Sequence, residues 1–356
     1  MTTHYRVIFP VGQGGFAFEN IGTTSIVYDC GSISSPARLE MYIDCLKAHD
    51  IKQIKQIKQI DYLFISHFDI DHVNGIQYLL SSGIKVVNAV MSAIPKDLHI
   101  VYNAATDGAY LAMRQLLERN ECEILEVNEE TQQKKFSESN QLWEWIAKSM
   151  LNNSDLQNLR QELQDNDIDV KRLDDAEYLD NHKVDINNVF KTVFGSLGPN
   201  AKGLVVLSQK TQNAILDSVR LLHRHEYCDL CHCDAWYCLH YPHHAYRHHL
   251  HNTSCLYTGD TRIKTQKEIE TIINFLQTYC HEKTLGIMQL PHHGSKYNIH
   301  NLLHQQIIAE LYFVHDNTDK RIKQSQPLYA DLEARHRLHV VKDICVDVIL
   351  GETNIH

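Results

Sequence analysis

The feature that most constrains this chain is a run of two histidines and two aspartates within six residues. His67, Asp69, Asp71 and His72 occur in SHFDIDH, directly after the apolar residues 61–65, which are typical of a short β-strand. A buried strand end cannot hold unpaired carboxylates, because burying an unpaired charge is very costly. A divalent cation neutralises carboxylates and uses imidazoles as ligands, so the pattern predicts a metal site. A solvated polar turn is the alternative.

Two later segments place the same kinds of side chain after apolar strands. Asp260 follows CLYTG, and His292 and His293 follow LGIMQLP. Ligands in α/β sheets gather outside the carboxyl ends of the strands, so three such strand ends would converge on one edge. A carboxylate such as Asp260 can bridge two cations about 3.5–4 Å apart. We therefore expect one centre with two divalent cations, assembled from three strand ends.

The composition limits the class of protein. The chain has 356 residues, of which 43% are hydrophobic and 22% charged, so it supports a packed core and excludes wholesale disorder. No apolar run approaches the ~18 residues that cross a bilayer, and the N-terminus lacks the layout of a secretory signal. We expect a cytoplasmic protein with mostly reduced cysteines and no membrane partner. A net charge of −10 argues against a surface that coats nucleic acid, but not against a local basic groove.

Strands and helices alternate along the sequence, which predicts a layered α/β fold. Pro36 opens an expected helix, and Thr265–Glu268 forms an expected capping box before another. Residues 97–180 are polar and charge-rich, and we interpret them as a helical insertion that includes helices at 111–117 and 143–150. Strands are expected at residues 4–9, 25–29, 61–65, 203–207, 254–258, 285–290, 310–314 and 346–350.

A second predicted insertion, residues 223–251, contains nine histidines and four cysteines. Cys228 and Cys231 have the two-residue gap of a zinc knuckle, and Cys233 and Cys238 would complete four thiolate ligands. Histidines of the same segment are alternative ligands. The segment predicts either an additional structural zinc site or an exposed loop that binds metal adventitiously.

The order of six motifs resembles the metallo-β-lactamase superfamily, and more narrowly the hydrolase domain of DNA-uptake competence proteins of the ComEC type and their stand-alone relatives. The resemblance implies an αββα sandwich over residues 1–356, with a metal centre at one edge of its two sheets. The motifs are VGQGG at 11–15, VYDCG at 27–31, SHFDIDHVNG at 66–75, GLVVL at 203–207, YTGD at 257–260 and PHHGS at 291–295.

By this resemblance, His67 and Asp69 would serve a first metal site. Asp71 and His72 would serve a second, and Asp260 would bridge the two.

One histidine of the pair His292 and His293 would complete the second site, and the resemblance does not decide which. Asp29 resembles an aspartate that orients a ligating histidine. Ser66 would do the same or be an ordinary turn serine.

Two departures from the family pattern stand out. The usual middle histidine, expected between His72 and Asp260, has no counterpart near GSLGPNAKG, so the first site is expected to be poor in ligands and metal-labile. Gly15 stands where an acidic residue commonly ends the first motif. Both departures favour an altered substrate or a weakened catalyst.

The sequence thus predicts a metal-dependent hydrolase, a phosphodiesterase or nuclease, that uses water activated by two cations, Zn or Mn. Asp71 or Asp260 would orient the nucleophile, and Lys296 would contact a substrate phosphate or simply be solvated. The alternatives are a hydrolase of a small nucleotide or other ester, and a metal-stabilised binding or regulatory protein with weak catalysis. The sequence does not determine the oligomeric state.

Overall fold

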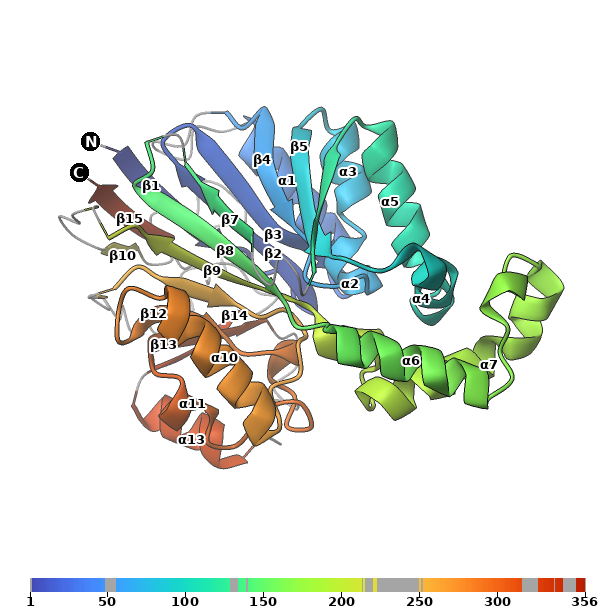
Figure 1. Cartoon of the computed structure of the whole chain (residues 1–356). Helices are drawn as coiled ribbons and strands as arrows, with labels where there is room; N and C mark the ends of the chain where they lie inside the picture. Colours follow the sequence, from blue (N-terminus) through green and yellow to red (C-terminus); the bar gives the residue numbers. More distant parts are fainter. Residues whose placement is uncertain are drawn as a thin grey trace.

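Two β-sheets face each other, and helices cover the outer side of each (Figure 1). The computed structural model describes residues 2–48, 56–128, 134–138, 140–212, 214, 220–222, 250, 252–315, 326–335, 337–341 and 350–355. This four-layer arrangement confirms the predicted αββα class.

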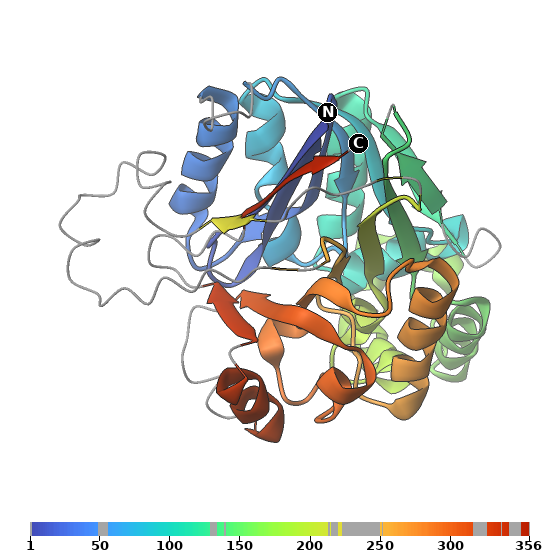
Figure 2. The same cartoon turned by 90° about the vertical axis from the view of Figure 1, so that its left-hand side faces the viewer.

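The first sheet has eight strands in the order β10-β15-β1-β2-β3-β4-β5-β6. Strands β3 to β6 are parallel, so their carboxyl ends share one edge of the sheet. The antiparallel pairing of β1 with β15 brings the two ends of the chain together, as Figure 2 shows. The strands are β1 Thr2–Ile8, β2 Gly14–Ile21, β3 Thr24–Ser32, β4 Gln59–Phe64, β5 Lys85–Ser92, β6 Glu123–Val127, β10 Arg220–Leu222 and β15 Leu350–Ile355.

The second sheet has seven strands in the order β14-β13-β12-β11-β9-β8-β7. Strands β11 to β14 are parallel, so they too end on one edge. These strands are β7 Lys134–Ser137, β8 Trp143–Ser149, β9 Leu204–Lys210, β11 Cys255–Tyr257, β12 Leu285–Gln289, β13 Ala309–His315 and β14 Leu338–Val341.

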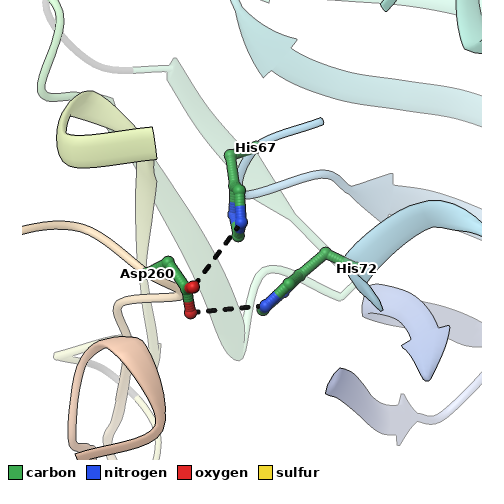
Figure 3. Close-up of side chains that lie close together, drawn as sticks. All are labelled: His67, His72 and Asp260. Atoms are coloured by element: carbon green, nitrogen blue, oxygen red, sulfur yellow. Dashed lines mark ion pairs between the residues drawn. The ribbon is translucent and has the colours of Figure 1, made fainter. Parts of the chain in front are cut away.

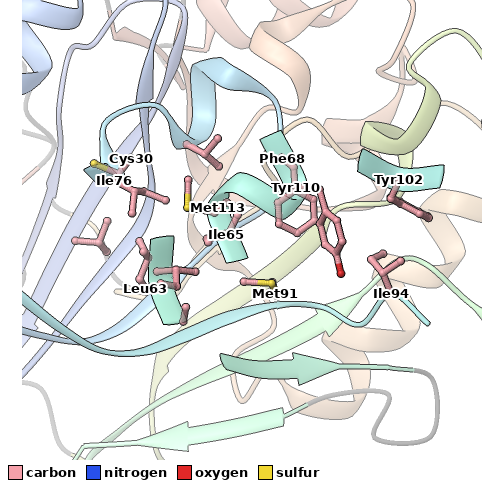
Figure 4. Packing of buried hydrophobic residues seen from close by; sticks show 14 of the residues in the cluster. Cys30, Leu63, Ile65, Phe68, Ile76, Met91, Ile94, Tyr102, Tyr110 and Met113 are labelled. Atoms are coloured by element: carbon pink, nitrogen blue, oxygen red, sulfur yellow. The ribbon is translucent and has the colours of Figure 1, made fainter. Parts of the chain in front are cut away.

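Three hydrophobic cores separate the four layers. One fills the space between the sheets, one lies under the helices of the first sheet (Figure 4), and one lies under those of the second. Helices of the first side include α1 Pro36–Ala48, α3 Ile76–Ser81, α4 His99–Ala105, α5 Ala109–Arg119, α6 Asn153–Asp165 and α7 Ala176–Phe194. Those of the second are α10 Gln266–Tyr279, α11 Leu303–Gln306 and α13 Gln326–Ala334.

The local signals in the sequence have physical counterparts in the structure. Helix α1 begins at Pro36, and the capping box of α10 forms as predicted between Thr265 and Glu268. The helix predicted at 143–150 is wrong, because this segment is strand β8. Trp143 and Trp145 point into the intersheet core while Ile146 faces the other way, and pairing with β7 and β9 overrides local helix preference.

The predicted insertions are described only in part. The span 97–180 supplies strands β6, β7 and β8 to both sheets as well as helices. Residues 223–249 and 251, with the four cysteines, lie outside the described residues, as does most of the strand predicted at 346–350. Among the helices of the described part, none has both the length and the apolar character needed to cross a bilayer.

Candidate metal centre

The first segment of the site leaves strand β4 and turns at once into the short helix α2 (Ile70–Val73). The helix follows Asp69, and the His72 N–H donates to the Asp69 carbonyl at 2.9 Å. His67, Asp71 and His72 are all buried, with 4%, 7% and 1% of their surfaces exposed. The turn therefore points polar side chains inward, away from solvent.

Asp260 stands on a tight turn after β11. The N–H groups of Thr258 and Gly259 both donate to Gln289 Oε1, at 2.9 and 3.0 Å, which ties the turn to strand β12. Gly259 has a φ of +52°, and a Cβ there would lie 2.5 Å from the Ser66 side chain. Only glycine permits so close an approach, so this turn brings Asp260 against the residues that follow β4.

The third segment is the turn η5 (His292–Gly294), which follows strand β12. His292 and His293 have φ values of 48° and 49°, a left-handed conformation that is uncommon outside glycine. The His292 N–H donates to the Gly259 carbonyl at 3.0 Å, and the Tyr329 hydroxyl donates to the Gly294 carbonyl at 2.9 Å. These bonds hold the turn beside Asp260.

The three segments bring their side chains to one point at the sheet edge. Asp260 Oδ1 lies 3.3 Å from His72 Nε2, and Asp260 Oδ2 lies 3.8 Å from His67 Nε2 (Figure 3). His293 Nε2 lies 3.3 Å from Asp71 Oδ2 and 3.7 Å from Asp260 Oδ1. We call these side chains the strand-end cluster; its members are His67, Asp69, Asp71, His72, Asp260 and His293.

Asp29 sets the orientation of two imidazoles. It accepts hydrogen bonds from the Ser66 N–H and hydroxyl, both at 2.7 Å, and lies 2.8 Å from His72 Nδ1. Because a carboxylate only accepts, neutral His72 carries its proton on Nδ1. The Ser66 proton goes to Asp29, so Ser66 Oγ accepts from His67 Nδ1 at 2.8 Å. Both rings therefore keep Nε2 free as an electron-pair donor.

His293 is oriented in the same way by the backbone. Its Nδ1 lies 3.1 Å from the carbonyl of His315, at the end of strand β13, and therefore donates to it. This leaves His293 Nε2 as the free nitrogen.

The donor atoms fit divalent cations. The Nε2 atoms of His67, His72 and His293 are buried and have no hydrogen-bond partner among the described residues. Their distances of 3.3–3.8 Å to carboxylate oxygens are longer than ordinary hydrogen bonds. Two donors about 2.1 Å from one tetrahedral ion stand about 3.4 Å apart, so a shared cation accounts for these spacings. Nitrogen and oxygen donors suit Zn or Mn.

The charges of the cluster are strongly coupled. Burial opposes ionisation of Asp260, but His293, His72 and His292 hold its pKa well below the usual value. Burial likewise opposes ionisation of Asp71, yet the neighbouring imidazoles of His293 and His72 lower the pKa of this carboxyl to about 2. The carboxylates therefore stay ionised near neutral pH and present negative charge to a cation.

The remaining predicted residues lie beside the strand-end cluster or outside the described residues. His292 Nδ1 is 2.7 Å from Asp260 Oδ2, but His292 is more exposed than His293 and is not one of the residues whose donor atoms group together. The Lys296 ammonium lies over the Tyr297 ring, 5.0 Å from its centroid. Cys228, Cys231, Cys233 and Cys238 lie outside the described residues.

Sequence reasoning missed two residues of the site. Asn200, in the turn η3 (Gly198–Lys202), donates its amide N–H to the Asp69 carboxylate. It lies within GSLGPNAKG, the segment in which the family pattern leads one to expect a histidine. Gly15 stands where the family pattern has an acidic residue, but a Cβ at this position would lie 3.0 Å from His72 Nδ1 and from Asp29 Cβ. Any side chain at this position would crowd the bond between Asp29 and His72.

One comparison with known proteins agrees with this geometry. The family described as the metallo-beta-lactamase superfamily matches residues 18–96, which include Asp29 and SHFDIDH. With the observed layers, this match supports the metallo-β-lactamase fold and superfamily. No curated protein matches the chain.

Similar solved structures include a metallo-beta-lactamase fold protein, YhfI, from Bacillus subtilis, with 8% identity, 99% of this chain and 100% of that chain covered, and a TM-score of 0.45. A putative metallo-beta-lactamase from Thermotoga maritima has 11% identity and a TM-score of 0.26, and the match covers 42% of this chain and 73% of that chain. A structure described as a peroxy diiron species of the chemotaxis sensor ODP has 13% identity, coverage of 40% and 48%, and a TM-score of 0.26.

Proposed function

We propose that this chain is a metal-dependent hydrolase that cleaves phosphodiesters with the help of two divalent cations, Zn or Mn. The observation that carries the proposal is the strand-end cluster itself, in which buried imidazole nitrogens and ionised carboxylates face one another without hydrogen bonds among the described residues. Such an arrangement is unfavourable unless positive charge occupies its centre.

In this proposal, His67 and Asp69 hold the first cation, and Asp71 with His72 holds the second. Asp260 bridges them, since its two oxygens face different imidazoles.

His293 completes the second site, in preference to His292, because its free Nε2 faces both Asp71 and Asp260. The more exposed His292 instead contacts Asp260 from outside and helps to fix its position.

When bound, the cations would lower the pKa of a shared water towards neutrality and stabilise charge on the phosphoryl and leaving oxygens. The chain itself supplies orientation. Asp29 and Ser66 hold His72 and His67 in the tautomer that exposes Nε2, as in other carboxylate–histidine–metal arrangements. Asp71 or Asp260 would orient the attacking water, and Lys296 would contact a substrate phosphate.

The phosphodiester substrate is supported by the motif resemblance to competence-type hydrolase domains, and the substrate would be nucleic acid or a small nucleotide. The net charge of −10 favours the small nucleotide or another small ester, because a long polyanion needs a basic track.

We further propose a cytoplasmic location and a structural zinc in residues 223–251. The alternative is a metal-stabilised binding protein. The presence of Asn200 in place of a histidine would favour this alternative.

Hydrolysis of bis-p-nitrophenyl phosphate with added Mn²⁺ or Zn²⁺ tests the proposal. We expect metal-dependent turnover that is abolished in Asp71→Ala and His72→Ala. The matched control is Asp97→Ala, which removes a partly exposed carboxylate paired with Arg160 and should leave turnover unchanged. Bound metal without turnover on any phosphodiester would favour the binding protein.

A further inference from the structure

The two halves of the strand-end cluster are unequally supplied with donors. Asp71, His72 and His293 form one group, which with Asp260 offers two imidazoles and two carboxylates. The other half rests on a single imidazole, that of His67. Its carboxylates alone do not make up this difference for a cation that prefers nitrogen ligands.

Asn200 lies against the poorer half. Its amide nitrogen donates to Asp69 Oδ2, and the residue is only 8% exposed. Its amide oxygen, Oδ1, is buried and has no hydrogen-bond partner among the described residues. A buried carbonyl oxygen left without a partner destabilises the folded protein, so this atom calls for an explanation.

The backbone fixes Asn200 in this place. The Leu204 N–H, just after η3, donates to the Ser66 carbonyl at 2.7 Å, and the Arg262 N–H donates to the Ala201 carbonyl at 3.2 Å. A Cβ at Gly203 would lie 2.8 Å from the Ser66 carbonyl oxygen. The turn η3 is thus held between the segment that carries His67 and the turn that carries Asp260.

We propose that Asn200 is a residue of the first cation site, where its amide nitrogen holds Asp69 and its amide oxygen faces the cation. This inference rests on the proposed function. An amide oxygen is a neutral, hard donor of the kind that Mn²⁺ and Mg²⁺ accept, whereas zinc prefers imidazole or thiolate. The first site is therefore weaker than the second and, relative to it, favours Mn²⁺ over Zn²⁺.

Metal titration of the metal-free protein tests this without any substrate. Zn²⁺ and Mn²⁺ are titrated separately against a chromophoric chelator. The wild type should bind two cations with affinities that differ at least about tenfold. Removal of a residue that supports a metal ligand typically lowers metal affinity about 10–100-fold, so Asn200→Ala should weaken the lower Mn²⁺ affinity by at least about tenfold. The higher affinity should change less than about twofold.

Asn200→His supplies the opposite change. A second imidazole nitrogen at the first site should raise its zinc affinity at least about tenfold and reduce its preference for Mn²⁺. If Asn200→Ala does not fold, Asn200→His is sufficient to test the inference. Unchanged zinc affinity in Asn200→His would overturn it.

The control is Asn252→Ala. Asn252 is a buried residue, 7% exposed, whose amide accepts a hydrogen bond from the Ser254 N–H and donates one to the Thr284 carbonyl. It lies just before β11, at the opposite end of this strand from Asp260. Its loss should leave both affinities unchanged. If the wild type binds two cations and Asn200→Ala behaves like this control, the inference is wrong but the proposed function stands. If the wild type binds no cation, the proposed function itself is wrong.

Discussion

Two buried groups of charged side chains in this molecule show what separates a structural cluster from a candidate site. The intersheet cluster consists of His4, Arg6, Glu19, Trp145, Ser208 and Tyr257, contributed by strands of both sheets. Both it and the strand-end cluster are buried and contain ionised carboxylates. Burial and charge alone therefore do not identify a functional site.

The difference lies in how the carboxylates are satisfied. Glu19 accepts hydrogen bonds from Arg6, from the Tyr257 hydroxyl at 2.7 Å, from Trp145 Nε1 at 3.0 Å and from the Ser208 hydroxyl at 2.6 Å. The chain itself thus satisfies the Glu19 carboxylate and thereby joins the two sheets. In the strand-end cluster the Nε2 atoms of His67, His72 and His293 make no such hydrogen bonds among the described residues, and the proposed cations would take that place.

Removal of the bridging carboxylate should have the largest effect. We expect Asp260→Ala to lower phosphodiesterase turnover by about a thousandfold or more, because both cations lose a ligand and the charge stabilisation they supply. Elemental analysis should find fewer than the two cations per chain expected for the wild type. Full metal content in this variant would contradict the assigned bridge.

Glu19→Gln should mainly reduce stability. It leaves the buried guanidinium of Arg6 without its negative partner, and breaking a buried ion pair in this way typically destabilises by about 3–5 kcal/mol. Urea denaturation measures this loss. The partly exposed control Glu282→Gln should change stability by less than about 1 kcal/mol. The folded Glu19→Gln protein should keep its metals, and loss of metal would erase the distinction between the two clusters.

Asp29→Asn tests whether the hydrogen bonds of Asp29 to Ser66 and His72 support metal binding by the strand-end cluster. Asn tolerates the left-handed backbone at this position, where φ is 54°, so the fold should persist. The amide cannot accept from both Ser66 and His72 as a carboxylate does, and we expect metal affinity to fall about 10–100-fold. Chelator competition measures the change. Unchanged affinity would mean that the histidines need no such support.

The smallest expected effect concerns pH and the intersheet cluster. Burial lowers the pKa of His4 from 6.5 to about 4, despite the opposing influence of Glu19. Below pH 6.5 the unfolded chain binds a proton that the folded chain does not, so stability falls as the pH drops towards 4. Between pH 6.5 and 5 this amounts to about 1–2 kcal/mol.

His4→Phe is the comparison for this pH effect, because it keeps an aromatic ring against Trp143 but cannot titrate. Both proteins are measured in chelator, so that metal release does not contribute. Equal pH dependence in the two proteins would show that His4 is not responsible.

The sequence was most informative where local chemistry fixes the structure. SHFDIDH, YTGD and PHHGS predicted which strand ends converge, and the capping box at Thr265 was visible in the letters. The prediction from sequence failed at Trp143 and Trp145, where a helix was expected. The strand forms there because β8 pairs with β9, a strand some sixty residues away, and no local pattern encodes this pairing. The choice between His292 and His293 likewise depends on a backbone carbonyl, that of His315, from another strand.

Asn200 illustrates the same limit. Nothing in GSLGPNAKG distinguishes this amide from an ordinary turn residue, and its contact with Asp69 arises only when η3 packs against the segment after β4. Ligand types can be recognised in a sequence, whereas the residues that complete their geometry come from tertiary packing.

Anomalous diffraction from crystals grown with Mn²⁺ tests the central claim most directly. The account predicts two anomalous peaks about 3.5–4 Å apart, one beside His67 and Asp69 and one beside His72 and His293, with Asp260 in contact with both. Absence of a peak at this sheet edge, with Mn²⁺ present at millimolar concentration, would contradict it.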